Sequence, residues 1–326
     1  MVSSAEELPL QKKEQKAMKG RLSYDGNTVF HIYQRTVDGC LLFYYARDYL
    51  VLYTMISLAA KRYGIQVIGL CQMPDHIHLL IRARDRKTIE RFVQFYSSRY
   101  TEYFHDQYGT AGTLFEGPFG MAEKIGDKRL RTAIAYLYNN PVEKKLCSAA
   151  KDYRWNYLAY GISDNPFSSQ KNLASSRRIF RRAVEELEYC RRQAKPLNGT
   201  IVSRMTEGLE EEEKKRLIDR IIVRYRFIDY EALGSYYESF QMMLLSFRSN
   251  TGSEYDIDEE FVPGSDKIYY RLLNAAEKIF GKDSFKKVLS LPEEKRRINV
   301  EVLIRLTGAS HRQVCKFLHL PQLPAV

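Results

Sequence analysis

The residues best suited to chemistry are two histidines, a tyrosine and an asparagine. His76 and His78 lie two positions apart in a run of β-type residues, so on a strand their side chains share one face. Two adjacent imidazoles form half of a metal site, although two histidines on a half-exposed sheet show the same spacing. Tyr136 and Asn140 lie four positions apart in a segment with helical spacing, so a phenol and an amide project together. Spacing alone does not decide whether Tyr136 is functional or a core residue, and Tyr138 is turned well away from it.

The surrounding sequence predicts the elements that would position these side chains. Two short β-type runs, residues 66–71 and 76–81, are joined by Met-Pro-Asp, which predicts a hairpin. Asp75 in this turn either orients His76 or simply serves the turn. Pro141 directly after Asn140 predicts that the helix ends or kinks there. The other elements are a strand at 29–37, a helix at 46–63 ended by Gly64, a helix at 86–108 ended by Gly109, a broken strand at 113–122 and a helix capped by Asp127. The order β-α-β-β-α-β-α predicts an α+β fold, an antiparallel sheet with helices packed on a face.

Composition limits the classes of protein that fit. The chain has 326 residues, which suits roughly two domains, and 44% hydrophobic residues exclude wholesale disorder. An excess of 51 Lys and Arg over 40 Asp and Glu favours a polyanionic partner. Five cysteines without a CxxC pair argue against a disulfide framework and fit a reducing cytosol. The apolar stretch at 41–60 contains Arg47 and Asp48, so it predicts a buried helix and no membrane span. With no secretory signal pattern at the N-terminus, we expect a cytoplasmic protein.

Four regions are predicted along the chain. Residues 1–27 form a polar N-terminal arm, 28–163 the first domain, 164–200 a basic helical linker, and 201–326 a helical C-terminal domain. The linker holds eight basic and three acidic residues between positions 171 and 195. The C-terminal domain ends in a helix-turn-helix-like pair at 296–320, in which Gly308 makes the turn and Ser310 caps the second helix.

Four ordered motifs resemble a known family. They are His76-Ile-His preceded by Met-Pro-Asp, Thr113-Leu-Phe-Glu-Gly-Pro-Phe, Tyr136-Leu-Tyr-Asn-Asn-Pro-Val and Tyr153-Arg-Trp-Asn-Tyr. Together they are similar to the single-tyrosine HUH transposases, and within them to the REP-associated tyrosine transposases of the IS200 type. The resemblance covers roughly residues 28 to 160 and implies a ferredoxin-like HUH nuclease domain with the tyrosine helix beside the histidine strand.

The resemblance also implies roles for the four residues. His76 and His78 would be ligands of Mg²⁺ or Mn²⁺, Asn140 would take the third-ligand position, and Tyr136 would be the nucleophile. The implied activity is cutting and rejoining of single-stranded, hairpin-forming DNA through a 5′-phosphotyrosine. The chemistry suits these residue types, because imidazole and amide ligands leave positions open for phosphate and a phenol forms a stable ester.

The DNA contacts and the assembly are less closely defined by sequence. Basic, aromatic and amide side chains in four segments are candidates for DNA contact: Arg82, Arg84, Arg99, Tyr100, Arg177, Arg178, Arg181, Arg182, Arg312, Gln313 and Lys316. A domesticated regulator that binds DNA without cutting it, and a structural or RNA-binding protein, are the alternatives. The resemblance favours the bacterial cytosol, associated with the nucleoid, and leaves monomer and dimer open.

Overall fold

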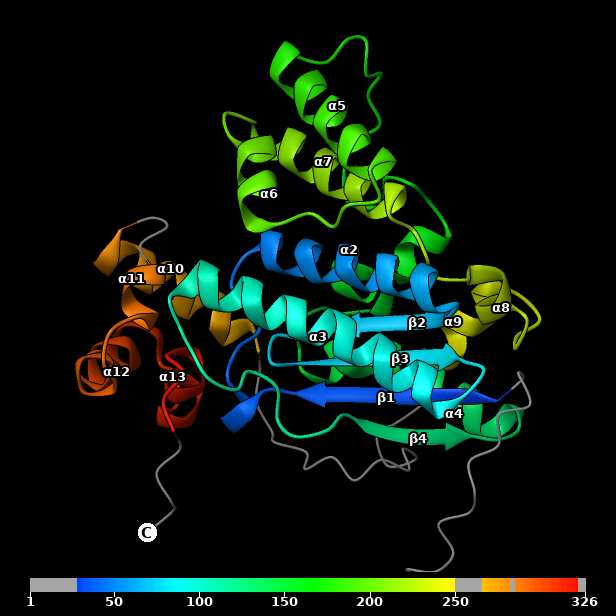
Figure 1. The fold of residues 1–326 in the computed structure, drawn as a ribbon, viewed down its shortest axis with the longest axis horizontal. Coiled ribbons are helices and arrows are strands. Elements are labelled where there is room, and N and C mark those ends of the chain that lie inside the picture. The colour runs from blue at the N-terminus through cyan, green and yellow to red at the C-terminus, as the bar shows by residue number, and fades with distance from the viewer. Residues whose placement is uncertain (1–27, 250–265, 282–284, 322–326) are drawn as a thin grey trace, which may run out of the picture.

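A four-stranded antiparallel sheet forms the centre of the first domain. The computed structural model describes residues 28–249, 266–281 and 285–321, so the predicted N-terminal arm lies outside the described residues. The strands are β1 (Val29–Arg35), β2 (Gln66–Gln72), β3 (His76–Arg82) and β4 (Gly120–Lys124), and their order across the sheet is β2-β3-β1-β4 (Figure 1). All three pairings are antiparallel, and β2 and β3 form the predicted hairpin. The predicted fold class is therefore confirmed.

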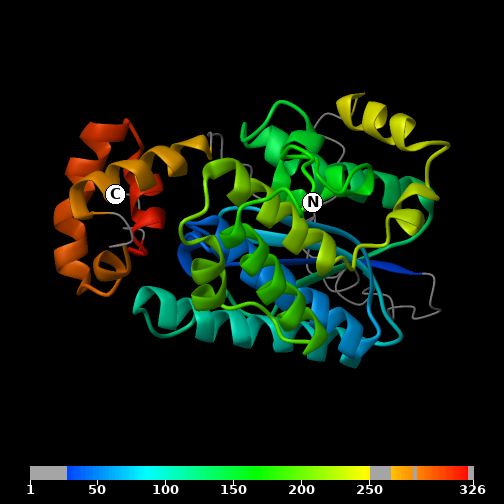
Figure 2. The ribbon, with the colours of Figure 1, turned by 90° about the horizontal axis from the view of Figure 1, so that it is seen from above.

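Helices cover both faces of this sheet, whereas the sequence predicted helices on a face. The helices α2 (Ala46–Tyr63) and α3 (Arg86–Tyr108) lie on one side, and α4 (Asp127–Glu143) lies on the other (Figure 2). Alternate residues of β1 show the division. Gln34 is hydrogen bonded to Ser97 of α3, while the ring of His31 lies against Tyr136 of α4. Because both faces are covered, polar side chains of β1 are buried along with the apolar ones.

The ends of α2 and α3 follow the sequence closely. Both helices end at a left-handed glycine, Gly64 (φ 64°) and Gly109 (φ 66°), as predicted. At the start of α2, the fully buried carboxylate of Asp48 accepts hydrogen bonds from two backbone N–H groups and from the hydroxyls of Tyr103 and Tyr108 on α3. One carboxylate thus satisfies the helix start and joins the two helices.

Three boundaries differ from the prediction. The strand expected at 113–122 begins only at Gly120, with an isolated bridge from Phe115 to β1. The helix α4 begins at Asp127 itself, after Gly126 (φ 79°). It also continues through Pro141 to Glu143. A proline this close to the helix end removes one backbone hydrogen bond, and a contact from Asn139 Nδ2 to the carbonyl of Phe247 (2.6 Å) helps to hold the turn.

The middle of the chain packs helices around the first domain. Short 3-10 turns lie at Val37–Gly39 after β1 and at Ala150–Asp152, Arg154–Asn156 and Leu158–Gly161 after α4. The helices α5 (Arg178–Arg192), α6 (Gly199–Thr206) and α7 (Glu211–Arg224) form a unit over α2 (Figure 1), while α8 (Tyr230–Gly234) contacts β2 and α9 (Phe240–Ser249) contacts α4. Tyr53 of α2 donates to the carbonyl of Ile222 on α7 (3.0 Å). Residues 164–200 therefore contribute α5 to a packed helical unit.

The last helices form a second unit at one end of the molecule (Figure 1). They are α10 (Lys267–Phe280), α11 (Phe285–Leu289), α12 (Glu293–Thr307) and α13 (His311–Phe317). Gly308 (φ 68°) ends α12, and the Ser310 side chain accepts from the backbone N–H of Gln313, as the sequence indicated. Within the described ranges, no helix is both long enough and apolar enough to cross a membrane.

Candidate active site

The structure brings the four predicted site residues together between β3 and α4. His76 and His78 lie on the same face of β3, with ring centroids 4.9 Å apart and planes at 84°. The ring of Tyr136 meets His78 edge-on at 5.4 Å, and Asn140 Nδ2 lies 3.2 Å from His78 Nε2. Tyr138 is turned away, as predicted, and stacks on Phe247 at 5.8 Å.

A third histidine, which the sequence analysis missed, completes the cluster. His31 of β1 is fully buried, and its Nε2 lies 3.0 Å from His78 Nδ1. Its ring also meets Tyr136 at 6.0 Å between centroids. The signal was present in β1, because His31, Tyr33 and Arg35 lie two positions apart on a strand and so share a face. What the sequence lacked was the pairing of β1 with β3.

The hydrogen bonds indicate which ring nitrogen carries the proton in His76 and in His78. The amide nitrogen of Asn140 can only donate, so His78 Nε2 accepts, and the neutral imidazole carries its proton on Nδ1 and donates it to His31. Asp75 Oδ1 lies 2.6 Å from His76 Nδ1, so that nitrogen donates to the carboxylate. Both Nε2 atoms are therefore unprotonated, which is the form that a metal ion requires, and an ion on His78 would replace the hydrogen bond from Asn140.

These residues fit a divalent cation. His76 Nε2 and Asn140 Oδ1 are buried and have no hydrogen-bond partner within the described residues. Among those residues, no three or more His, Cys, Asp or Glu side chains are grouped to hold a metal ion. Two imidazole nitrogens and one amide oxygen suit Mn²⁺ or Mg²⁺ with further positions left open.

Asp75 serves both the turn and His76. Its backbone carbonyl accepts from Thr36, and its second carboxylate oxygen lies 3.0 Å from Lys316 Nζ. Burial would raise the pKa of Asp75, but the neighbouring His76 and Lys316 outweigh it and lower that pKa overall. The carboxylate thus stays ionised behind His76, which resolves the two roles that the sequence left open.

A tyrosine lies across the edge strand beside the histidines. Tyr33 pairs with His78 across β1 and β3 and with Gly120 across β1 and β4. A Cβ atom at Gly120 would lie 1.9 Å from the Tyr33 ring, so only glycine permits this position of the ring. Tyr33 is partly exposed, and it places an aromatic surface next to the site.

Some predicted DNA contacts lie on the surface. Arg84 is 88% exposed in its side chain, and Arg178, Arg182 and Arg312 are also exposed. Arg99 is exposed and lies over the ring of Phe95 at 4.3 Å. Their side chains are exposed to solvent, and their contact with DNA remains a prediction.

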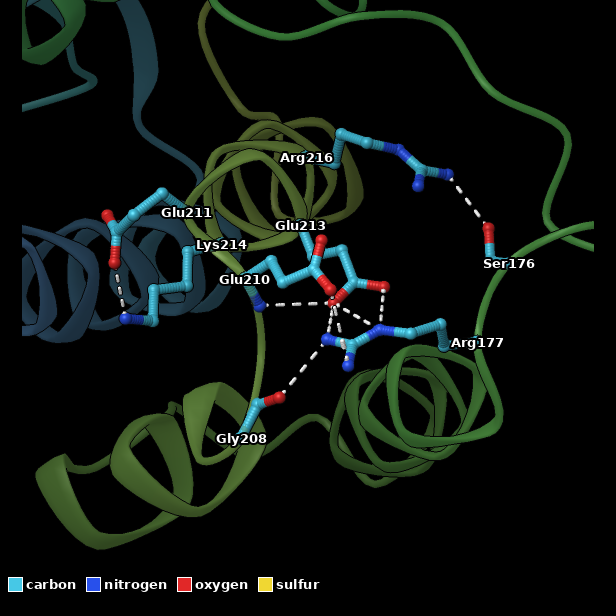
Figure 3. Close-up of polar contacts among 8 residues, drawn as sticks. All are labelled: Ser176, Arg177, Gly208, Glu210, Glu211, Glu213, Lys214 and Arg216. Atoms are coloured by element: carbon cyan, nitrogen blue, oxygen red, sulfur yellow. Dashed lines mark hydrogen bonds and ion pairs between the residues drawn. The ribbon is translucent and has the colours of Figure 1, made fainter.

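Other residues predicted to contact DNA are bonded to neighbouring residues of the protein. Tyr100 is fully buried and donates to the carbonyl of Leu42, so the expectation that it stacks on a base is wrong. Lys316 pairs with Asp75 and keeps only 17% of its side chain exposed, so it does not project into a groove. The remaining residues make polar contacts: Arg82 with Gln66 and Tyr236, Arg177 with Glu213, Arg181 with the carbonyls of Ala174 and Ser176, and Gln313 with the backbone of Ser310. Figure 3 shows the Arg177 guanidinium, which donates to the carbonyl of Gly208 and to the carboxylate of Glu213 and so joins α5 to α7.

The comparison with known proteins agrees with this site. Residues 42–140, which contain all four predicted site residues, match the family model described as Transposase IS200 like. Over these residues, the match confirms the predicted resemblance to the IS200-type transposases. No curated protein matches the chain. A solved structure described as a REP-associated tyrosine transposase bound to a REP hairpin aligns with 48% of this chain and 96% of its own, at 12% identity and a TM-score of 0.36. The family match supports a transposase-type function.

Proposed function

We propose that this protein cuts and rejoins single-stranded, hairpin-forming DNA, with Tyr136 as the nucleophile and a divalent cation held by His76, His78 and Asn140. The observation that carries the proposal is the convergence of these residues. Two strand histidines, each with an unprotonated Nε2, lie beside a tyrosine and an amide whose oxygen is buried without a partner in the described structure. A pure binding protein has no need of this combination.

The side chains have separable roles in the proposed reaction. When bound, the cation neutralises charge on the non-bridging phosphate oxygens. The edge-on packing against His78 and His31 restricts the Tyr136 ring and so limits where its hydroxyl can point. In the reaction the tyrosine oxygen forms a bond to phosphorus, the bond to the 3′ oxygen breaks, and the phenol proton is lost while the 3′ hydroxyl gains one. The phosphotyrosine keeps the bond energy, so the reverse step can join another 3′ end.

The test is a denaturing gel of the protein with a labelled pool of single-stranded hairpin DNAs and Mg²⁺ or Mn²⁺. We expect a metal-dependent covalent band that Tyr136→Phe abolishes while DNA binding on a native gel is largely kept. Tyr138→Phe is the matched control, because it removes the same hydroxyl two positions along the same helix. Burial raises the pKa of Tyr138 well above its ordinary value, so that hydroxyl is not expected to react.

Two outcomes would contradict the proposal. A covalent band retained in Tyr136→Phe would assign the nucleophile to another residue. If no covalent band forms with any metal while the same pool is bound on a native gel, the regulator that binds without cutting becomes the better description.

A further inference from the structure

The C-terminal helix α13 places a charged side chain directly behind a metal-binding histidine. Lys316 Nζ lies 3.0 Å from Asp75 Oδ2, and Asp75 Oδ1 lies 2.6 Å from His76 Nδ1. Lys316 and Asp75 are each 17% exposed in their side chains. The carboxylate therefore bridges the lysine and the histidine, and the lysine comes from a region well beyond the residues that match the family model.

Several contacts fasten α13 in this position. The backbone carbonyl of Lys316 accepts from the N–H of Leu41 (3.3 Å), and the carbonyl of Phe317 accepts from the hydroxyl of Tyr44 (2.7 Å). The lysine passes over Gly39, which has a left-handed backbone (φ 63°) and no side chain in the way. A Cβ atom there would lie 2.8 Å from Lys316 Nζ. The segment between β1 and α2 is thus shaped to receive the lysine.

We propose that Lys316 is a positioning residue: it holds the Asp75 carboxylate against His76, so that the C-terminal helices set the metal affinity of a site in the first domain. This inference rests on the metal site of the proposed function. A carboxylate fixed at both oxygens cannot rotate away from the imidazole, and the imidazole in turn keeps its proton on Nδ1 and its Nε2 lone pair toward the site. Without the lysine, one oxygen of the Asp75 carboxylate loses its bond to Lys316, and the other oxygen keeps its bond to His76.

The sign of the effect separates positioning from simple electrostatics. Removing a positive charge near a cation site, with nothing else changed, would raise the affinity for the cation, because charge repulsion is lost. Loss of positioning lowers that affinity, and partners behind metal ligands commonly account for about 10- to 100-fold in metal affinity. The two roles of Lys316 therefore predict opposite changes.

The experiment is a titration of the full chain with Mn²⁺ in the absence of DNA, followed by electron paramagnetic resonance of the free ion. Lys316→Met keeps an unbranched side chain, one atom shorter, and removes the charge, and we expect it to weaken Mn²⁺ binding by roughly 10-fold. Lys278→Met is the matched control, because Lys278 is an exposed lysine of α10 in the same helical unit. We expect the control to bind Mn²⁺ as the parent protein does.

A second variant covers the case in which Lys316→Met does not fold. Asp75→Asn combined with Lys316→Met leaves no unpaired carboxylate, and the amide oxygen at position 75 can still accept from His76. If Lys316 acts through Asp75, this double variant binds Mn²⁺ as weakly as Asp75→Asn alone, because the two effects do not add.

The outcomes distinguish the inference from the function on which it rests. Unchanged or tighter Mn²⁺ binding in Lys316→Met overturns the positioning role, as does a further loss in the double variant beyond Asp75→Asn. If the parent protein itself does not bind Mn²⁺, the proposed metal site is wrong, and the positioning role fails with it.

Discussion

The histidine that the sequence did not reveal gives the sharpest test of the site. His31 accepts the hydrogen bond that His78 Nδ1 donates. This bond keeps the proton of His78 on Nδ1 and leaves Nε2 unprotonated, as a metal ion requires. Replacing His31 with Met removes the acceptor in a buried environment. His78 is then free to carry its proton on Nε2 instead, and that proton must leave before a metal ion can bind.

The magnitude follows from the cost of a buried donor without an acceptor, about 1–3 kcal/mol. Since about 1.4 kcal/mol corresponds to tenfold in a binding constant, Mn²⁺ affinity is expected to fall roughly 5- to 150-fold. His31→Gln is the matched control, because its side-chain amide can supply an acceptor near the position of Nε2. We expect His31→Gln to recover part of the loss in a calorimetric Mn²⁺ titration.

Two results would refute this reasoning in different ways. If His31→Met binds Mn²⁺ as tightly as the parent protein, the bond to His78 does not control the form of that imidazole. If Mn²⁺ binding disappears altogether in both His31 variants, far beyond the range above, His31 is itself a ligand of the ion.

Two further predictions concern the edge of the site and the docking of the C-terminal helices. Gly120→Ala should lower the free energy of unfolding by about 1–3 kcal/mol in urea denaturation, because its Cβ meets the ring of Tyr33. In a Tyr33→Ala background, most of that loss should disappear. An equal loss in both backgrounds would show that the ring is not the cause. Burial lowers the pKa of His319 to about 4 from an ordinary 6.5. The neutral side chain therefore contributes to the stability of the folded state above pH 6.5. That contribution, roughly 3 kcal/mol, is lost as the pH falls from 6.5 to 4. His319→Asn should flatten the pH dependence of unfolding in this window, and an unchanged slope would assign it to other groups.

Local patterns in the sequence were enough to predict most elements of the first domain. The ends of α2 and α3 at Gly64 and Gly109 were predicted because a left-handed glycine is a local signal. The shared face of His76 and His78 follows from the strand period, and the opposite directions of Tyr136 and Tyr138 follow from the helix period. The resemblance to IS200-type transposases added what periods cannot supply, namely that these two pairs belong to one site.

The contacts that the sequence did not reveal all join elements that are distant in the chain. His31 reaches His78 across 47 positions through the pairing of β1 with β3, and Lys316 reaches Asp75 across 241 positions through the docking of α13. The sequence of the helix pair alone predicted that Lys316 contacts DNA. Its burial follows from packing of that pair on another domain, which no local period reports.

The same contacts explain why the site depends on so many parts of the chain. In the proposed metal site, each imidazole presents an unprotonated Nε2 because its Nδ1 proton has an acceptor, and the two acceptors come from different directions. His31 serves His78 from the neighbouring strand, whereas Asp75 serves His76 and is itself held by Lys316. A change in β1 should therefore act mainly through His78, and a change in α13 mainly through His76. Because both histidines would hold one ion in the proposed site, losses from the two sides should combine in the affinity for that ion.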